Sequence, residues 1–231
     1  MSAKRRREGD DAVHGETADS AGAGSRWDDT YGRGEANLSW YQPYPAPSLR
    51  MIAAAAIDST GAVIDVGGGA GHLVDALLDR DFEDVTVLDI SAVGIEQARQ
   101  RLGARAARVQ WLVQDVLAWR PTRRYDVWHD RAVFHFLTSP AGRAAYLTTL
   151  EQATHPRSIA IFGTFAPEGP TRCSGLPVAR YGPDRLAATL GSRWHPIASA
   201  AERHTTPGGA IQPFTWVVFS RTAGDVSSVP P

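Results

Sequence analysis

The chain has few of the residues that many specialised sites require. Cys173 is the only cysteine among 231 residues, so an internal disulfide and a cysteine-based metal cluster are excluded. No apolar run approaches the ~18 residues needed to cross a bilayer. The start of the chain is polar and charged, unlike a secretory signal peptide. We therefore expect a cytoplasmic protein with no membrane partner and no metal.

The chain also lacks an excess of charge of either sign. It carries 24 Lys and Arg against 25 Asp and Glu, which gives no electrostatic case for a nucleic-acid partner. Lys4 is the only lysine, a bias toward arginine that is typical of GC-rich bacterial coding sequences. Residues 1–25 and 222–231 contain hardly any bulky apolar side chains. We expect both to be disordered tails on one domain spanning residues 26–221.

What the chain does have is a run of glycines between a strand pattern and a helix pattern. The stretch 63–73 reads VIDVGGGAGHL, in which an acid, Asp65, precedes the glycines. Glycine lets the backbone approach a ligand closely, and a helix start offers unpaired N–H groups. The turn therefore predicts a nucleotide-like ligand held by Asp65 and the glycines Gly67, Gly68, Gly69 and Gly71.

The spacing of these glycines separates the classes of nucleotide ligand. A dinucleotide fingerprint would require glycine where His72 stands, and a phosphate-binding loop would require a lysine after the glycines. The pattern D-x-G-x-G-x-G, which begins at Asp65, resembles motif I of the class I S-adenosylmethionine-dependent methyltransferases. This resemblance implies S-adenosyl-L-methionine as the cofactor and S-adenosyl-L-homocysteine as its product.

Two further strand patterns also end at acids. The pattern 85–90 ends beside Asp89, about 20 residues past the glycines, where nucleotide-binding α/β folds bind ribose hydroxyls. The pattern 109–113 ends just before Asp115, and the resemblance implies that this carboxylate accepts from the adenine amine. Ile90 and Val116, the residues next to these acids, are expected at the same cofactor site.

The resemblance implies an α/β fold with a Rossmann-like, seven-stranded methyltransferase sheet. The sheet is expected to be mostly parallel, with the last strand antiparallel and helices on both faces. Further strands are predicted at 125–129, 158–165, 194–204 and 214–220, and the turn Pro207-Gly208-Gly209 joins the last two as a hairpin. A terminal antiparallel strand distinguishes this sheet from an all-parallel dinucleotide-binding sheet.

Two segments are expected to shape the acceptor pocket. Aromatic residues gather in 26–58, which we interpret as a cap that brings Trp40, Tyr41 and Gln42 to the substrate; simple core packing is the alternative. The long, Pro- and Gly-rich segment 166–181 is interpreted as a lid. It would contribute Cys173 and Tyr181 to substrate binding, although a plain loop thiol remains the alternative for Cys173.

The fourth predicted strand runs into the segment DRAVFHFL, residues 130–137. His129 and Asp130 stand at its end, where class I methyltransferases hold the transferring methyl group, so we expect both in catalysis and His129 also at the cofactor. Arg131 is expected to contact the acceptor. His135 is a third catalytic candidate, with a buried structural histidine as the alternative. The segment is similar to the D-K-G-T-x-D of protein lysine methyltransferases, because Asp130 matches and an arginine replaces the lysine.

The favoured hypothesis is methyl transfer to an N, O or S atom of a small metabolite, a natural product or a short peptide. A protein lysine methyltransferase is the alternative, with a protein as acceptor. A non-catalytic cofactor-binding interaction protein and an NAD-dependent oxidoreductase are more distant alternatives. The chain is expected to act as a monomer or a homodimer.

Overall fold

The computed structural model describes residues 20–34 and 37–222, so most of the two expected tails lies outside the described residues. One boundary needs correction: helix α1 (Ser20–Tyr31) begins inside the segment 1–25 that was expected to be disordered. The helix docks on the start of α4, where Oδ1 of Asp28 accepts from Oγ of Ser91 (2.6 Å) and from N of Val93 (3.1 Å). These tertiary contacts order a segment with little apolar surface of its own.

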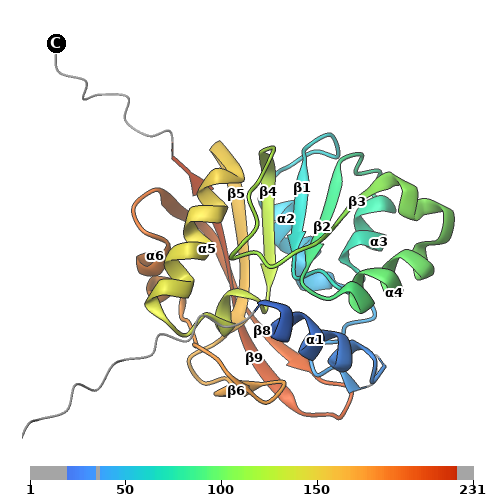
Figure 1. Ribbon diagram of the computed structural model, residues 1–231. Helices are drawn as coiled ribbons and strands as arrows, with labels where there is room; N and C mark the ends of the chain where they lie inside the picture. The colour runs from blue at the N-terminus through green and yellow to red at the C-terminus, as the bar shows by residue number, and fades with distance from the viewer. Residues whose placement is uncertain (1–19, 35–36, 223–231) are drawn as a thin grey trace, which may run out of the picture.

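Seven strands form one sheet in the order β3-β2-β1-β4-β5-β9-β8 (Figure 1). Strands β1 to β5 are mutually parallel, and β9 is antiparallel to both β5 and β8. This confirms the predicted sheet with its antiparallel last strand. The strands are β1 (Val63–Val66), β2 (Val85–Asp89), β3 (Val109–Val113), β4 (Tyr125–Arg131), β5 (Thr154–Phe165), β8 (Trp194–Thr205) and β9 (Ile211–Arg221).

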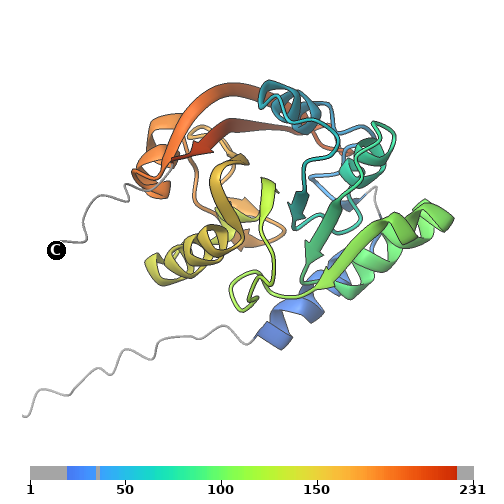
Figure 2. The same cartoon turned by 90° about the horizontal axis from the view of Figure 1, so that it is seen from above.

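Helices cover both faces of the sheet. One apolar cluster buries α2 (Ala46–Ala54), α3 (Leu73–Leu78) and α4 (Ala92–Leu102) against the first face. A second cluster buries α5 (Pro140–Gln152) and α6 (Pro183–Leu190) against the other, and Figure 2 shows α2 and α5 on opposite sides. Every residue of β1 and β2 is buried, as expected for parallel strands covered on both faces. Two 3₁₀ helices, η2 (Gly103–Arg108) and η3 (Phe134–Phe136), lie in connections.

The segment 166–181 contains regular structure. Strands β6 (Arg172–Cys173) and β7 (Leu176–Pro177) pair antiparallel as a small hairpin. Figure 1 shows this hairpin at the same edge of the sheet as α1, the edge where the parallel strands end. Its position agrees with the expected role as a lid, which stays a prediction.

Candidate active site

The turn after β1 is built from glycines that no other residue type replaces easily. Gly67 and Gly69 have φ angles of +69° and +43°, a left-handed backbone that favours glycine. A Cβ on Gly68 would lie 2.6 Å from Oδ2 of Asp65. The backbone therefore passes directly over this carboxylate, and Gly67, Gly68 and Gly71 line a cavity of about 70 Å³ beside it.

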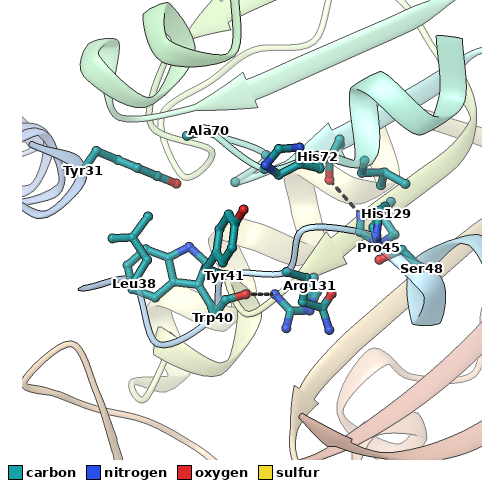
Figure 3. A pocket seen from close by; sticks show the side chains of 16 residues that line it. Tyr31, Leu38, Trp40, Tyr41, Pro45, Ser48, Ala70, His72, His129 and Arg131 are labelled. Carbon is teal, nitrogen blue, oxygen red and sulfur yellow. Dashed lines mark hydrogen bonds and ion pairs between the residues drawn. The ribbon is translucent and has the colours of Figure 1, made fainter. Parts of the chain in front are cut away.

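Asp65 and His129 are register partners on β1 and β4. Nδ1 of His129 lies 2.7 Å from Oδ1 of Asp65, and both side chains are buried and line the same cavity (Figure 3). When the carboxylate accepts the Nδ1 proton, Nε2 carries the lone pair of the ring. In the described part of the chain, Nε2 has no hydrogen-bond partner. The site thus holds an oriented imidazole with one acceptor atom that the described residues do not use.

Asp89 is a buried acid at the end of β2. Its Oδ1 accepts from N of Ser91 at 2.7 Å, and the hydroxyl of Tyr31 donates to the same carboxylate. Burial raises the pKa of Asp89 to about 7, and the negative charge of Asp65 adds to the rise. A Cβ on Gly69 would collide with the Tyr31 hydroxyl. Helix α1 therefore covers the carboxylate that the sequence assigns to ribose binding.

Asp115 and Ile90 line a second cavity, of about 500 Å³, whose other side is formed by α1. Oδ1 of Asp115 accepts from N of Leu117 at 2.9 Å. Val116, which was expected at the cofactor, is buried in the second core cluster instead. Tyr31 lines the first cavity and Ile90 lines the second. Asp89 accepts a hydrogen bond from Tyr31 and precedes Ile90 in the chain, so it lies between the two cavities.

Four of the six residues expected on the acceptor side meet at the first cavity: Trp40, Tyr41, Gln42 and Arg131. Figure 3 shows Arg131 and Trp40 across the cavity from Ala70 and His72 of the glycine turn. Nη1 of Arg131 donates to the carbonyl of Trp40 at 2.8 Å. The cap segment and the end of β4 are thus held together at the place where the sequence predicts the acceptor pocket.

Polar residues of the last hairpin support this side, and sequence reasoning missed them. Oε1 of Glu202 accepts from Nε2 of Gln42, and Oε2 from Nε1 of Trp216, both at 2.6 Å. Nε2 of His204 lies 2.7 Å from the carbonyl of Ser39. A sequence separation of 160 residues divides Gln42 from Glu202, so no local pattern connects them. The one available signal was that Glu202 is the only acid in its strand.

Asp130, expected in catalysis, does not reach the cavity. Its side chain is fully buried on the face of β4 opposite His129, as strand alternation requires. The carboxylate accepts from N of Val133 and of Phe134, each at 3.0 Å, and from the hydroxyl of Tyr146. Burial raises its pKa to about 6. These contacts fix the turn after β4, which corrects the expectation of a catalytic carboxylate.

The expected site residues His135, Cys173 and Tyr181 also lie outside both cavities. His135 is buried against Phe165, and burial together with the charge of Arg131 lowers its pKa to about 3. Burial raises the pKa of the Cys173 thiol. Tyr181 packs its ring against the core. The structural alternatives weighed for His135 and Cys173 are therefore the better interpretation of these positions.

The order of the strands and the positions of three acids define the class of the protein. Asp65, Asp89 and Asp115 stand at or just past the ends of three adjacent parallel strands, and an antiparallel strand completes the sheet. This is the arrangement that motif I predicts for a class I S-adenosylmethionine-dependent methyltransferase domain. Residues 63–157 match the family model described as "Methyltransferase domain", which confirms the class that the motif predicts.

Two curated relatives are also methyltransferases. The malonyl-[acyl-carrier protein] O-methyltransferase of Anoxybacillus flavithermus is 32% identical over 104 residues, which are 45% of this chain and 38% of that protein. The tRNA1(Val) (adenine(37)-N6)-methyltransferase of Cronobacter sakazakii is 33% identical over 104 residues, 40% of this chain and 42% of that protein. The chain thus spans about two fifths of the length of the relatives it matches.

Solved structures share the fold over most of the chain. A protein from a study of the conversion of a disulfide bond into a thioacetal group during echinomycin biosynthesis superposes with a TM-score of 0.69 at 23% identity, covering 88% of this chain and 95% of that one. The N-methyltransferase NodS from Bradyrhizobium japonicum WM9, in complex with S-adenosylhomocysteine, gives a TM-score of 0.65 at 14% identity, covering 85% and 98%. At these identities the likeness shows the fold.

Within 20–34 and 37–222, no group of three or more His, Cys, Asp or Glu side chains is arranged to hold a metal ion. Among the helices of the same residues, none combines the length and the apolar character that crossing a membrane requires.

Proposed function

We propose that this protein transfers the methyl group of S-adenosylmethionine to an N, O or S atom of a small metabolite, a natural product or a short peptide. The observation that carries the proposal is the buried pair of Asp65 and His129, which lines the cavity between the glycine turn and the cap, and in which Nε2 of His129 has no partner among the described residues. From its composition, we also propose that the protein is bacterial and cytoplasmic and that it acts as a monomer or a homodimer.

The residues present fit the cofactor. A Cβ on Gly68 would meet Asp65, so the turn leaves room only for backbone. Asp89, which the Tyr31 hydroxyl covers here, has the two acceptor oxygens that a pair of ribose hydroxyls needs. Asp115 and Ile90 line the larger cavity, where the adenine ring would lie. When bound, S-adenosylmethionine supplies an electrophilic methyl group.

The chain's own contribution is to hold the acceptor in line and to exclude water. Positioning of this kind supplies up to about 7–11 kcal/mol of barrier reduction. Trp40 and Tyr41 line the cavity beside His129, and Nε2 of His129 accepts the proton of an acceptor that must lose one. Asp65 keeps the ring oriented during that transfer.

The small size of the cavity favours a small acceptor over a folded protein. Its volume is about 70 Å³, and its walls come from the glycine turn, the cap and β4. Similar folds occur in echinomycin biosynthesis and in the N-methyltransferase NodS, which supports this choice. The lysine methyltransferase alternative rested on Asp130, which is buried against Tyr146 instead of facing the cavity.

The test combines binding and turnover. S-adenosylhomocysteine should bind the full chain in a calorimetric titration, and lysate incubated with labelled S-adenosylmethionine should yield labelled small molecules. His129→Gln should lower turnover about 100-fold or more for an acceptor that loses a proton. His155→Gln is the matched control, because it breaks a second His–Asp pair, with Asp126 at 2.9 Å, at the other end of β4.

Three results would count against the proposal. Tight binding of NADH in place of S-adenosylhomocysteine would contradict the cofactor. Label found only on protein would contradict the small acceptor. Equal turnover of the His129 and His155 variants would contradict the role of His129 as proton acceptor and leave positioning as its only contribution.

A further inference from the structure

Arg131 is a partly buried cation that uses only part of its hydrogen-bonding capacity. Nη1 donates to the carbonyl of Trp40. Nε and Nη2 are buried, and neither has a hydrogen-bond partner among residues 20–34 and 37–222. A charged donor left without a partner away from water is costly, because it has lost hydration and gained nothing in return. Arg131 therefore needs an acceptor that the described chain does not supply.

The nearest carboxylates do not meet this need. Glu202 and Asp65 act on Arg131 through their charge, but each is already hydrogen bonded elsewhere. Glu202 accepts from Gln42 and from an indole of β9, and Asp65 is paired with His129. Burial also lowers the pKa of Arg131, the expected effect on a cation without a direct counter-ion.

The guanidinium is held in a definite orientation. Its Cζ lies 5.0 Å from the ring centroid of Phe214 on β9, and Nη1 is tethered to the cap at Trp40. The two unused donors, Nε and Nη2, share one edge of the planar guanidinium. That edge presents two parallel N–H groups, which match the two oxygens of a carboxylate.

Arg131 lies next to the proposed proton acceptor. It follows His129 by two residues on β4, so the two side chains leave the same face of the strand, and both line the first cavity. Figure 3 shows Ala70 and His72 of the glycine turn on one side and Arg131 with Trp40 on the other. The cation thus stands across the cavity from the turn that holds the cofactor.

We propose, resting on the function proposed above, that Arg131 binds a carboxylate of the methyl acceptor through Nε and Nη2. The substrates are then small carboxylic acids whose nucleophilic N, O or S atom lies within reach of His129. In the reaction the acceptor atom forms the new bond to the methyl carbon and its proton passes to Nε2 of His129. The electron pair of the broken bond stays on the cofactor's sulfur.

Benzoate and benzamide test this proposal, because they share size and shape and differ in the carboxylate. Each is titrated into the full chain saturated with S-adenosylhomocysteine and followed by ligand-observed NMR. Wild type should bind benzoate about tenfold or more tightly than benzamide. Arg131→Gln should lose this preference, and Arg131→Lys, which keeps the charge without the planar edge, should keep only part of it. Arg124→Gln, which removes an exposed cation before β4, should keep all of it.

Every other result overturns the proposal. Benzoate that fails to bind wild type, acid and amide that bind equally, or a preference that survives in Arg131→Gln each removes its basis. A tenfold loss of S-adenosylhomocysteine affinity in both Arg131 variants would show that Arg131 holds the methionine carboxylate of the cofactor instead. Binding of S-adenosylhomocysteine to wild type is measured first, before any probe is added. If wild type does not bind it, the proposed function itself is contradicted.

Discussion

Protonation of Asp89 is predicted to oppose cofactor binding. Burial raises the pKa of this carboxyl to about 7, and ribose hydroxyls can donate only to its acceptor oxygens, which the ionised form offers most fully. With that pKa the ionised fraction is about 0.9 at pH 8 and about 0.1 at pH 6. The affinity for S-adenosylhomocysteine should therefore fall about tenfold between these pH values.

Calorimetry in buffers of different ionisation enthalpy measures this coupling directly. At pH 6, binding to wild type should release close to one proton, while at pH 8 it should release about a tenth of one. Asp89→Asn should bind more weakly and with a flat pH profile. A wild-type affinity that stays constant from pH 6 to pH 8, or an Asp89→Asn variant that keeps the tenfold slope, would refute the reasoning.

The same shift predicts the sign of a stability effect without ligand. Between pH of about 4 and about 7 the folded state holds a proton on Asp89 that the unfolded state has lost, so the contribution of Asp89 to the free energy of unfolding falls as pH rises through this window. This contribution should be absent in Asp89→Asn. Urea titrations of wild type and variant at pH 5 and pH 7.5 compare the two, and a variant that loses as much stability as wild type would contradict the assigned pKa.

Three further predictions concern single residues. Gly68→Ala should weaken S-adenosylhomocysteine binding by roughly tenfold or more in calorimetry, because the new Cβ would press on the Asp65 carboxylate. Tyr146→Phe should cost about 1–3 kcal/mol in urea unfolding, since the hydroxyl joins Asp130 to the Trp128 indole, while turnover stays unchanged. Burial lowers the pKa of His135 to about 3, so the contribution of His135 to the free energy of unfolding falls as pH falls below about 6.5; His135→Leu should remove this contribution, which changes the unfolding constant by up to about tenfold per pH unit in acid titrations.

The sequence carried most of the information about the fold. Buried parallel strands appear as short apolar runs, and the turn residues at 207–209 mark the last hairpin, so the sheet and its antiparallel strand were predictable. The strand pattern also predicts which residues lie on the cofactor side of the site. Strand ends of a parallel sheet share one edge, and therefore Asp65, Asp89 and Asp115 could be brought together from their positions in the chain.

The residues at the end of β4 show where such prediction stops. His129 and Asp130 are neighbours in sequence and both are ionisable, yet alternation sends them to opposite faces. Their tertiary contacts decide which of the two enters the site: His129 pairs with Asp65, and Asp130 pairs with Tyr146. Helix α1 was missed because its order comes from Asp28 and its contacts with the start of α4, and local composition does not show such contacts.

The family match covers the cofactor side of the site but little of the acceptor side. The family match ends at residue 157, and it covers the glycine turn, the three acids, His129 and Arg131. The walls of the acceptor side come largely from elsewhere, from the cap at 37–45 and from the hairpin that carries Glu202 and Phe214. A shared methyl donor therefore does not imply a shared acceptor. Arg131 lies in the matched region, whereas Trp40 and Phe214, which hold its guanidinium, lie outside it, so the surroundings of this cation are set by residues that the family match does not cover.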